Sequence, residues 1–575
     1  MRSVHWVFVP LLLLTGGTLR ISAAPLRPSH AAHAMVASVH ELASRAGVDV
    51  LRRGGNAVDA AVATGFALAV VHPQAGNLGG GGFMLIRMTD GQMHFIDYRE
   101  KAPLAATANM YLDSQGNLIP GSSLVGYKSI AVPGSLAGMV FAESKYGRVG
   151  LQRVMDPAIH LARDGFALAW EDTQDLRDPE LGKFPESRHI FQRDGNYYKP
   201  GEVFIQPLLA RTLERLAHNP DDFYHGEMAR EIATAIGKGG GLIRRQDLSS
   251  YEVKEREPIL GTYRGYHIVS APPPSSGGVA LIEILNILEG YDLDQLGNRS
   301  AESIHLITEA FRRAFFDRAE FMGDPDFAKV PVAALIDKRY GAAWRQSVDP
   351  EHASISRELK RPTIFSELEQ YAWREPGPLG PESSNTTHYS VVDREGNAVA
   401  VTTTLNDSFG SRVTVEGLGF LLNDEMDDFA AKPGVPNLYG LIQGPANAIG
   451  PGRRPLSAMT PTMVLKDGKL FLVLGTPGGP TIITTVANIL MGVIDYDLDI
   501  QEAVNAPRFH HQWSPDQILL EDRISPDTLH SLASKGHTLK LEHFWGDGEC
   551  IEVDPKTGER LGASDGRNNG KVVGY

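Results

Sequence analysis

Cysteine is almost absent from this sequence, which has Cys550 as its single cysteine in 575 residues. One cysteine excludes a disulfide framework within the chain and any cysteine-based metal cluster. No pattern around Cys550 marks a reactive thiol, so we expect a plain buried side chain. Positive charge is also scarce, because 55 basic residues against 69 acidic ones give a net charge of −14. Nucleic-acid binding needs a basic face, so this charge argues against a nucleic-acid partner.

Long apolar runs are absent after residue 24, so we expect no membrane-spanning helix in the rest of the chain. Residues 1–24 themselves have a basic start at Arg2, an apolar stretch over 6–14 and small residues at Ala23 and Ala24. This layout predicts a secretory signal peptide and an exported protein, periplasmic or secreted. The alternative is that the segment stays on the chain as an N-terminal membrane anchor.

Glycine is in surplus, at 60 of 575 positions, and it punctuates the N-terminal pattern. Residues 41–53 are predicted to form a helix that ends at Gly54-Gly55. Asn56 is then a suitable N-cap for a second helix that extends to about Val71. This second helix is apolar nearly all round, so we expect it to be buried.

Paired β-rich runs recur in both halves of the chain. Three hairpins are predicted, at 83–99 around Asp90-Gly91, at 387–405 and at 462–477. Residues 130–320 are predicted to be mainly helical, and a further helix is expected to follow Gly478-Gly479-Pro480 through about Asp495. Antiparallel hairpins interleaved with buried helices favour a layered α+β fold.

The hairpin over 386–405 has a register that the sequence defines. If residues 394–396 form a three-residue loop with Gly396 in the left-handed region, Thr386 lies directly opposite Thr404, with Cβ atoms about 5 Å apart. One interpretation is a buried threonine nucleophile with a hydroxyl partner. The other is an ordinary cross-strand threonine pair, which geometry alone favours because such pairs are common in sheets.

Familiar catalytic signatures are missing. The chain has neither G-x-x-x-x-G-K-[ST] nor G-x-S-x-G nor S-x-x-K, so nucleotide loops and the commonest serine hydrolases have no support. His388, His510 and His511 are candidate metal ligands by residue type, but no H-E-x-x-H accompanies them. Adjacent residues on a strand also point to opposite faces. We therefore expect no metal site.

Several long motifs occur in order along the chain: GGNAVDAAVA, the glycine run 79–82, DYREKAP, SSNTTHYSVVD, TTTLNDSFGS, GPGRRPLSAMTPTMV, LGTPGGPTIITT, NAPRFHHQW and GASDGR. In these motifs the sequence resembles the γ-glutamyltransferase (γ-glutamyltranspeptidase) family of N-terminal nucleophile hydrolases. The resemblance implies a four-layer αββα sandwich with two antiparallel sheets between helical layers. It also implies a glutathione hydrolase that passes the γ-glutamyl group to water, amino acids or peptides, without a metal or organic cofactor.

The same resemblance implies a precursor that cuts itself between Asn385 and Thr386. The products would be a large subunit, residues 25–385, and a small subunit, residues 386–575, interwoven in one domain as a heterodimer. Cleavage would give Thr386 a free α-amine with a pKa near 8, able to act as the base for its own hydroxyl.

The resemblance also assigns roles around this nucleophile. Thr404 matches the family's hydroxyl partner, in agreement with the hairpin register. Gly478 and Gly479 match the backbone donors of an oxyanion hole, where a strand-to-helix junction offers free N–H groups. A tight turn is the ordinary interpretation of this glycine pair, and both can hold together.

Further matches concern the two charges of a γ-glutamyl group. Arg99 and Ser457 match residues that bind the α-carboxylate, while Ala458 stands where the family usually has a second serine. One hydrogen bond to that carboxylate is therefore missing or replaced by water. The residues that match the α-amino-binding set are Asn406, Glu425 and Asp428. Residues 433–443, around Tyr439, resemble a loop that covers the pocket.

The sequence leaves two alternatives open. The first is a cephalosporin acylase of the same fold, against which the retention of Arg99, Asn406, Glu425 and Asp428 argues. The second is an exported binding protein that never cleaves itself, against which the presence of both Thr386 and Thr404 argues. Self-cleavage and release of glutamate from glutathione separate these possibilities.

Overall fold

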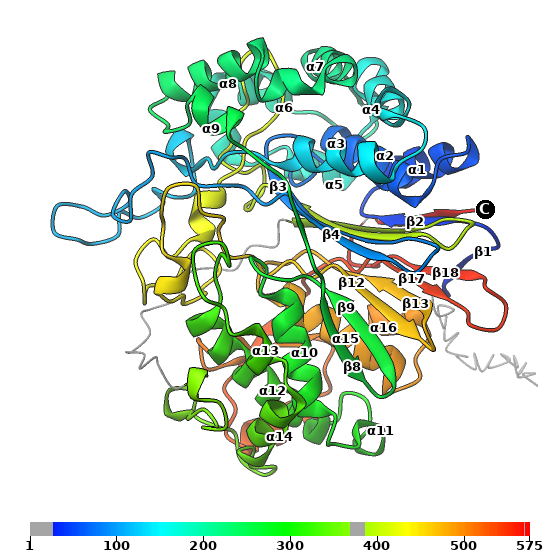
Figure 1. Ribbon diagram of the computed structural model, residues 1–575, viewed down its shortest axis with the longest axis vertical. Coiled ribbons are helices and arrows are strands. Elements are labelled where there is room, and N and C mark those ends of the chain that lie inside the picture. The colour runs from blue at the N-terminus through cyan, green and yellow to red at the C-terminus, as the bar shows by residue number, and fades with distance from the viewer. Residues whose placement is uncertain (1–26, 369–385, 569) are drawn as a thin grey trace, which may run out of the picture.

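Two seven-stranded sheets form the centre of the fold (Figure 1). The computed structural model describes residues 27–368, 386–568 and 570–575, so the predicted signal peptide and Asn385 lie outside the described residues. The first sheet runs, in spatial order, β1 Ser29–Ala31, β18 Arg560–Ala563, β17 Cys550–Val553, β13 Lys469–Leu474, β12 Thr462–Lys466, β9 Tyr266–Ser270 and β8 Ile259–Tyr263. The second runs β19 Lys571–Gly574, β2 Met35–Ser38, β10 Thr386–Val392, β11 Ala398–Thr404, β3 Gly81–Arg87, β4 Met93–Asp97 and β7 Lys254–Arg256. Neighbouring strands in both sheets are antiparallel.

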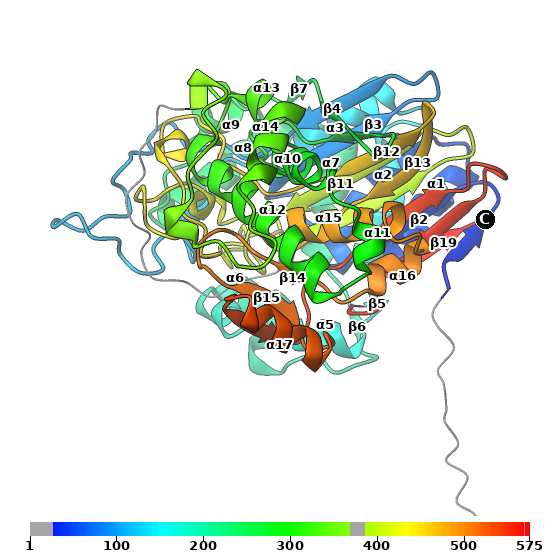
Figure 2. The same ribbon diagram turned by 90° about the horizontal axis from the view of Figure 1, so that it is seen from below.

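Helices cover the outer face of each sheet. The second sheet is covered by α1 Glu41–Arg52, α2 Ala57–Val71 and α3 Ser135–Tyr146, with α2 against β10 and β11. Farther from the sheet lie α4 Leu151–Asp164, α7 Pro207–His218 and α8 Glu227–Lys238. The first sheet is covered by α10 Gly277–Leu288, α12 Ala301–Phe321, α14 Lys338–Gln346, α15 Thr481–Ile494 and α16 Ile500–Asn505, with α10 against β8 and β9. Figure 2, from below, shows α10, α12, α15 and α16 of this layer. The expected αββα sandwich is confirmed.

The described chain also contains further α-helices and β-strands. They are α5 Trp170–Asp175, α6 Pro185–Gln192, α9 Arg245–Ser249, α11 Leu293–Leu296, α13 Val332–Leu335, α17 Pro526–Ser534, β5 Phe166–Ala167, β6 Val203–Phe204, β14 Phe509–His510, β15 Ile518–Glu521 and β16 Leu539–Glu542. Within the described ranges, no helix is both long and apolar enough to cross a membrane.

The N-terminal helix pair follows its sequence signals. The Asn56 side chain accepts hydrogen bonds from the N–H groups of Val58 and Asp59, and the Asp59 carboxylate accepts one from the Asn56 N–H, which completes a capping box. Every residue of α2 is buried. Burial on all sides is what its uniformly apolar sequence predicts.

The predicted hairpins are confirmed, including the register of β10 and β11. Thr386 pairs with Thr404, and Gly396 in the connecting turn has a φ of 89°. β10 lies between β2 and β11, so a strand from the C-terminal part of the chain is enclosed by strands from both parts. The register places Thr386 and Thr404 side by side at the same end of this strand pair, where β10 begins and β11 ends.

One stretch of the chain differs from the expectation. Residues 130–320 are mainly helical, but β7, β8 and β9 lie within them, and β8 and β9 form a hairpin at the edge of the first sheet. The turn contains Arg264, with a φ of 51°, before Gly265. A non-glycine residue in the left-handed region hides a turn from sequence patterns that depend on glycine or asparagine at that position.

Candidate active site

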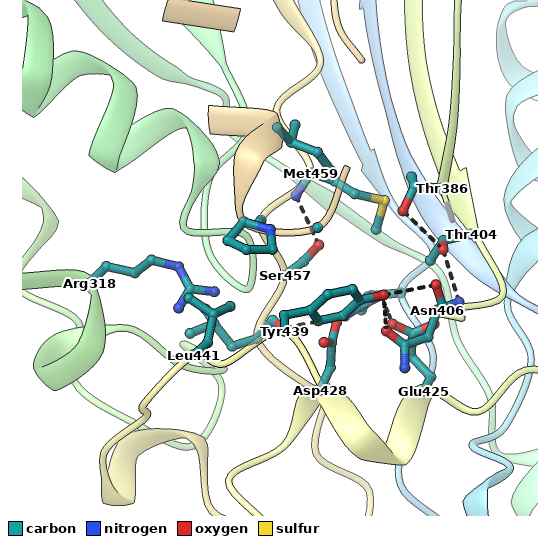
Figure 3. Close-up of a pocket in the computed structure, with 16 residues that line it drawn as sticks. Arg318, Thr386, Thr404, Asn406, Glu425, Asp428, Tyr439, Leu441, Ser457 and Met459 are labelled. Carbon is teal, nitrogen blue, oxygen red and sulfur yellow. Dashed lines mark hydrogen bonds and ion pairs between the residues drawn. The ribbon is translucent and has the colours of Figure 1, made fainter. Parts of the chain in front are cut away.

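Thr386 lies in the wall of a narrow, polar cavity at the end of the sheet where β10 begins and β11 ends (Figure 3). Its hydroxyl oxygen is 3.2 Å from that of Thr404, within hydrogen-bonding distance. The Thr404 oxygen also accepts a hydrogen bond of 2.9 Å from the Asn406 backbone N–H. Asn406 has a φ of 81°, so the chain turns sharply here and brings a polar side chain to the threonine pair.

A buried arginine holds the opposite part of the cavity. The Arg99 guanidinium is hydrogen-bonded and ion-paired to Glu425 and Asp428, and Glu100 lies 3.5 Å away. Burial alone would lower the pKa of Arg99, but the carboxylates of Glu425, Asp428 and Glu100 raise it above its usual value. Arg99 is therefore a permanent cation.

The carboxyl groups around this arginine outnumber it. Burial raises the pKa of Glu100 to about 7 against the effect of Arg99, and burial likewise raises the pKa of Glu425. One oxygen of each of these two carboxyl groups is buried without a hydrogen-bond partner among the described residues. The cluster can therefore exchange partners when a ligand with an ammonium and a carboxylate group arrives.

Tyr439 covers the cavity. Its hydroxyl donates to the backbone and side-chain oxygens of Asn406, at 2.9 Å each, and its ring packs over Gly479. A Cβ at Gly479 would lie 2.8 Å from that ring, and the Gly479 φ is 55°, so only glycine suits this position. The Leu438 N–H donates to the Asp427 carboxylate at 3.0 Å, which ties the covering loop to the acidic turn.

The backbone around Ser457 and Ala458 forms another wall. The Ser457 hydroxyl accepts a hydrogen bond from the Met459 N–H at 3.1 Å, and the Ser457 carbonyl accepts one from the Ser276 hydroxyl at 2.7 Å. Ala458 lines the same cavity and presents only a methyl group. In this part of the wall Ser457 therefore offers a hydroxyl and Ala458 offers none.

Gly478 and Gly479 lie in the loop between β13 and α15, as the sequence predicts. Gly479 lines the cavity, whereas Gly478 lies next to it in the chain and is not part of the lining. The Gly478 carbonyl accepts hydrogen bonds from the Thr481 N–H and hydroxyl, at 3.1 and 2.7 Å. Within the described part of the chain, neither glycine N–H has a hydrogen-bond acceptor.

The cavity brings together nearly all the residues that the sequence singles out. Its lining contains Arg99, Thr386, Thr404, Asn406, Glu425, Asp428, Tyr439, Ser457, Ala458 and Gly479. Sequence analysis missed Arg318, a charged residue of α12 that lines the same cavity. The apolar members of the lining fall within the covering loop 433–443 and the motifs GPGRRPLSAMTPTMV and LGTPGGPTIITT, although the sequence predicts no individual role in the cavity for them; they are Leu441, Leu456, Met459, Pro480 and Ile482. No local motif distinguishes Arg318.

A second, larger cavity also reaches Thr386. Its volume is about 330 Å³, whereas that of the first cavity is about 20 Å³. Thr386 is the one described residue that lines both. The carboxylates in the second lining are Glu171, Asp172, Asp175 and Asp547, and its Arg567 is already paired with Glu521 and Asp565.

Histidine and cysteine stand apart from this chemistry. Burial lowers the pKa of His388 to about 3, and its ring bonds to Thr402 and Ser390. Cys550 is buried, as expected, and burial raises its thiol pKa. Neither lines the narrow cavity in the described chain.

One described group has ligand atoms that a metal ion could use, and it lies outside both cavities. His305, Glu309 and His537 place these atoms within 4.8 Å of one another. The carboxylate of Glu309 is already ion-paired with Arg312 and Arg313, and His305 is hydrogen-bonded to His537 at 2.8 Å. The two arginines oppose a further cation there.

The αββα sandwich is the fold of N-terminal nucleophile hydrolases, and the position of Thr386 at the start of a central strand, with its hydroxyl in a polar cavity, agrees with that class. Comparison with known proteins is more specific. The sequence model of the Gamma-glutamyltranspeptidase family matches residues 43–575, and the chain belongs to that family.

Relatives support this membership over most of the chain. A glutathione hydrolase proenzyme of Pseudomonas sp. (strain A14) is 51% identical, with 91% of this chain and 89% of the relative covered. One from Escherichia coli (strain K12) is 48% identical, with 97% and 96% covered. The crystal structure of a cephalosporin acylase from Bacillus halodurans has a TM-score of 0.83 at 26% identity, covering 98% of this chain and 99% of that one.

Proposed function

We propose that this protein hydrolyses the γ-glutamyl amide bond of glutathione and related compounds, and that Thr386 is its nucleophile. The observation that carries the proposal is the Thr386–Thr404 hydroxyl pair in the same cavity as Arg99, Glu425 and Asp428. The relatives at 51% and 48% identity, both glutathione hydrolase proenzymes, support the same substrate.

The charges of the cavity suit a γ-glutamyl group. This group carries an α-carboxylate and an α-ammonium on one carbon, so its site needs a cation and anions a few ångströms apart. The fork of Arg99 suits the carboxylate, and Glu425 and Asp428, with Asn406, suit the ammonium. In this structure Arg99, Glu425 and Asp428 bind one another, so the substrate replaces existing ion pairs.

We infer that the precursor cuts itself between Asn385 and Thr386. The large subunit would be residues 25–385 and the small subunit 386–575, held as a heterodimer by sheets that contain strands of both. The interleaving of β10 between β2 and β11 supports such an assembly, since separation would break a central strand from its neighbours. The proenzyme names of the relatives agree. The signal-like sequence of residues 1–24 supports export to the periplasm or medium.

The reaction follows from this arrangement. The α-amine released on Thr386 accepts the proton of the Thr386 hydroxyl, and the oxygen attacks the γ-carbonyl carbon. Backbone N–H groups of Gly478 and Gly479 stabilise the oxyanion, a contribution of about 3 kcal/mol for one such donor in other hydrolases. The departing amine takes the proton, which leaves a γ-glutamyl ester on Thr386. Water then releases glutamate, or an amine takes the group.

The second cavity provides a route for that amine. It adjoins Thr386 without sharing any other residue of the glutamyl site, so an acceptor can occupy it while the acyl group stays in place. Acidic side chains outnumber basic ones in its lining. Burial raises the pKa of Asp547 to about 8, so the remaining carboxylates are the ones that favour acceptors with positive charge.

The proposal is tested with purified protein in two steps. A gel and N-terminal sequencing should show two fragments, the smaller beginning at Thr386. Glutamate release from glutathione should then be measured for the wild type and for Thr386→Ala, with and without a chelator. Full-length protein without glutamate release would contradict the proposal. Faster cleavage of a β-lactam side chain than of glutathione would favour an acylase instead.

A further inference from the structure

Arg318 is a buried arginine without a carboxylate partner. It is 3% exposed and projects from α12 into the same cavity as Thr386 (Figure 3). Its Nε donates to the Ser276 hydroxyl at 2.9 Å, and in the described chain its two terminal nitrogens have no hydrogen-bond acceptor. Buried arginines are almost always paired, so this one has capacity for a ligand.

Neighbouring arginines show how unusual this is. On the same helix, Arg312 is paired with Glu309 and Asp516, and Arg313 is paired with Glu309. Arg99, the other arginine of the cavity, is engaged by Glu425 and Asp428. Arg318 is therefore the cation in the described lining whose charge is not balanced by an adjacent carboxylate.

Arg318 remains charged at neutral pH. Burial lowers its pKa to about 10, and Asp428 is the carboxylate whose charge acts in the opposite direction. Asp428 itself is held by Arg99. An anion that entered the cavity would thus find a protonated guanidinium with two free N–H-bearing nitrogens.

Ser276 connects Arg318 to the wall that contains Ser457. The Ser276 hydroxyl accepts from Arg318 and donates to the Ser457 carbonyl at 2.7 Å, and the Ser276 N–H donates to the same carbonyl at 2.8 Å. The guanidinium is thereby fixed beside Ser457 and Ala458. Figure 3 shows Arg318 on the side of the cavity opposite Thr386, with Ser457 between them.

We propose that Arg318 is a second carboxylate-binding residue, which contacts the α-carboxylate of the γ-glutamyl donor together with Ser457 and Arg99. The position fits, because the γ-carbonyl must lie at Thr386 and the α-carbon lies three bonds beyond it, toward the wall at Ser457. The role of Arg318 also compensates for the methyl group of Ala458. This inference rests on the proposed function and adds a residue to donor recognition.

Three donors separate the charges of the substrate. A γ-glutamyl anilide carries both groups, a glutaryl anilide keeps the carboxylate and lacks the amine, and a 4-aminobutanoyl anilide keeps the amine and lacks the carboxylate. The kcat/KM for each should be measured with processed wild type, Arg318→Gln and Arg318→Lys. Thermal melting and a gel establish folding and processing of each variant.

We expect Arg318→Gln to lower kcat/KM for the γ-glutamyl and glutaryl anilides by about ten- to a hundred-fold, mostly through KM, the effect of one hydrogen bond to a charge. The 4-aminobutanoyl anilide should change less than about twofold. For the two donors that carry a carboxylate, the kcat/KM of Arg318→Lys should lie between those of wild type and Arg318→Gln. If Arg318→Gln is not processed into two fragments, Arg318→Lys provides the test: its kcat/KM should fall for the two carboxylate donors and not for the 4-aminobutanoyl anilide.

Equal losses for all three donors would overturn the proposal, because they would mean that Arg318 only supports the cavity wall. Ser276→Ala is the matched control: it removes the anchor of Nε but keeps the charge, and should give a smaller loss confined to the same two donors. Wild type that fails to cleave the γ-glutamyl anilide would instead contradict the proposed function, so the two failures are distinct.

Discussion

The hydroxyl oxygens of Thr386 and Thr404 lie 3.2 Å apart because β10 and β11 pair with these two residues directly opposite each other. The Thr404 hydroxyl oxygen also accepts a hydrogen bond from the Asn406 N–H, which fixes the position of that hydroxyl. A hydroxyl in this position can orient the proposed nucleophile and form a hydrogen bond to its oxygen as that oxygen loses its proton, so no histidine is needed.

Replacing the nucleophile tests the most basic step. Thr386→Ala should remain a single full-length chain and release no glutamate, because in the proposed mechanism both self-cleavage and acyl transfer use the Thr386 hydroxyl oxygen. Thr387→Val is a matched control, since the Thr387 hydroxyl is buried without a hydrogen-bond partner among the described residues. It should be processed and active. Two fragments from Thr386→Ala on a gel would contradict the assignment.

Thr404→Val should slow chemistry more than binding. The substitution keeps the shape of the side chain and removes the hydroxyl that pairs with Thr386 and accepts the Asn406 N–H. Because the Thr404 hydroxyl stabilises the Thr386 oxygen as that oxygen loses its proton, we expect kcat to fall about ten- to a hundred-fold, the worth of one hydrogen bond to a charged group. KM should rise less, through the Asn406 backbone that loses its acceptor. Steady-state kinetics on the processed variant measures this. A raised KM with normal kcat would show that Thr404 acts on the substrate instead.

Arg99 is predicted to stabilise the fold as well as bind substrate. Arg99→Gln leaves Glu100, Glu425 and Asp428 together without their guanidinium, and removing one partner of a buried ion pair costs about 3–5 kcal/mol. The apparent Tm of Arg99→Gln should therefore fall clearly below those of wild type and Arg99→Lys. A second substitution, Glu425→Gln, should recover part of the loss. An unchanged Tm for Arg99→Gln would contradict this account.

Asp427 gives the fold a dependence on pH. Burial raises the pKa of Asp427 to about 7, while its hydrogen bonds from Ser123 and Leu438 act in the opposite direction. A raised carboxyl pKa means that its contribution to stability is fully present below the ordinary pKa near 4 and is lost as pH rises to about 7. Asp427→Asn lacks this titration, so its Tm should fall less than that of wild type between pH 5 and 8. Parallel Tm profiles would refute the assignment.

Local signals were sufficient for much of this structure. The capping box at Asn56 and the turn at Gly396 depend on neighbouring residues, so the helix and the register of Thr386 could be read from the sequence. The charged cluster around Arg99 depended on family resemblance, because no spacing rule joins residues over 300 positions apart. Arg318 gave no signal, since it differs from Arg312 and Arg313 only in the partners that tertiary packing supplies.

Ala458 offers a substitution that should improve the enzyme. Its side chain lines the cavity beside Ser457 and is 8% exposed, at the position where the resemblance to the family implies a second serine. Ala458→Ser adds one hydroxyl toward the α-carboxylate, and hydrogen bonds to charged groups contribute about 1.5–3 kcal/mol, less the cost of desolvating the hydroxyl. We expect KM for γ-glutamyl donors to fall about three- to tenfold while kcat stays within about twofold.

The donor without a carboxylate is the control for Ala458→Ser. The 4-aminobutanoyl anilide should gain nothing, because the new hydroxyl has no charge to meet. In Arg318→Gln the added hydroxyl should restore part of the lost affinity for carboxylate donors, since both groups act on one carboxylate and their effects are coupled. Full additivity of Arg318→Gln and Ala458→Ser would mean that the guanidinium and the new hydroxyl meet different parts of the substrate, and would argue against a shared carboxylate site.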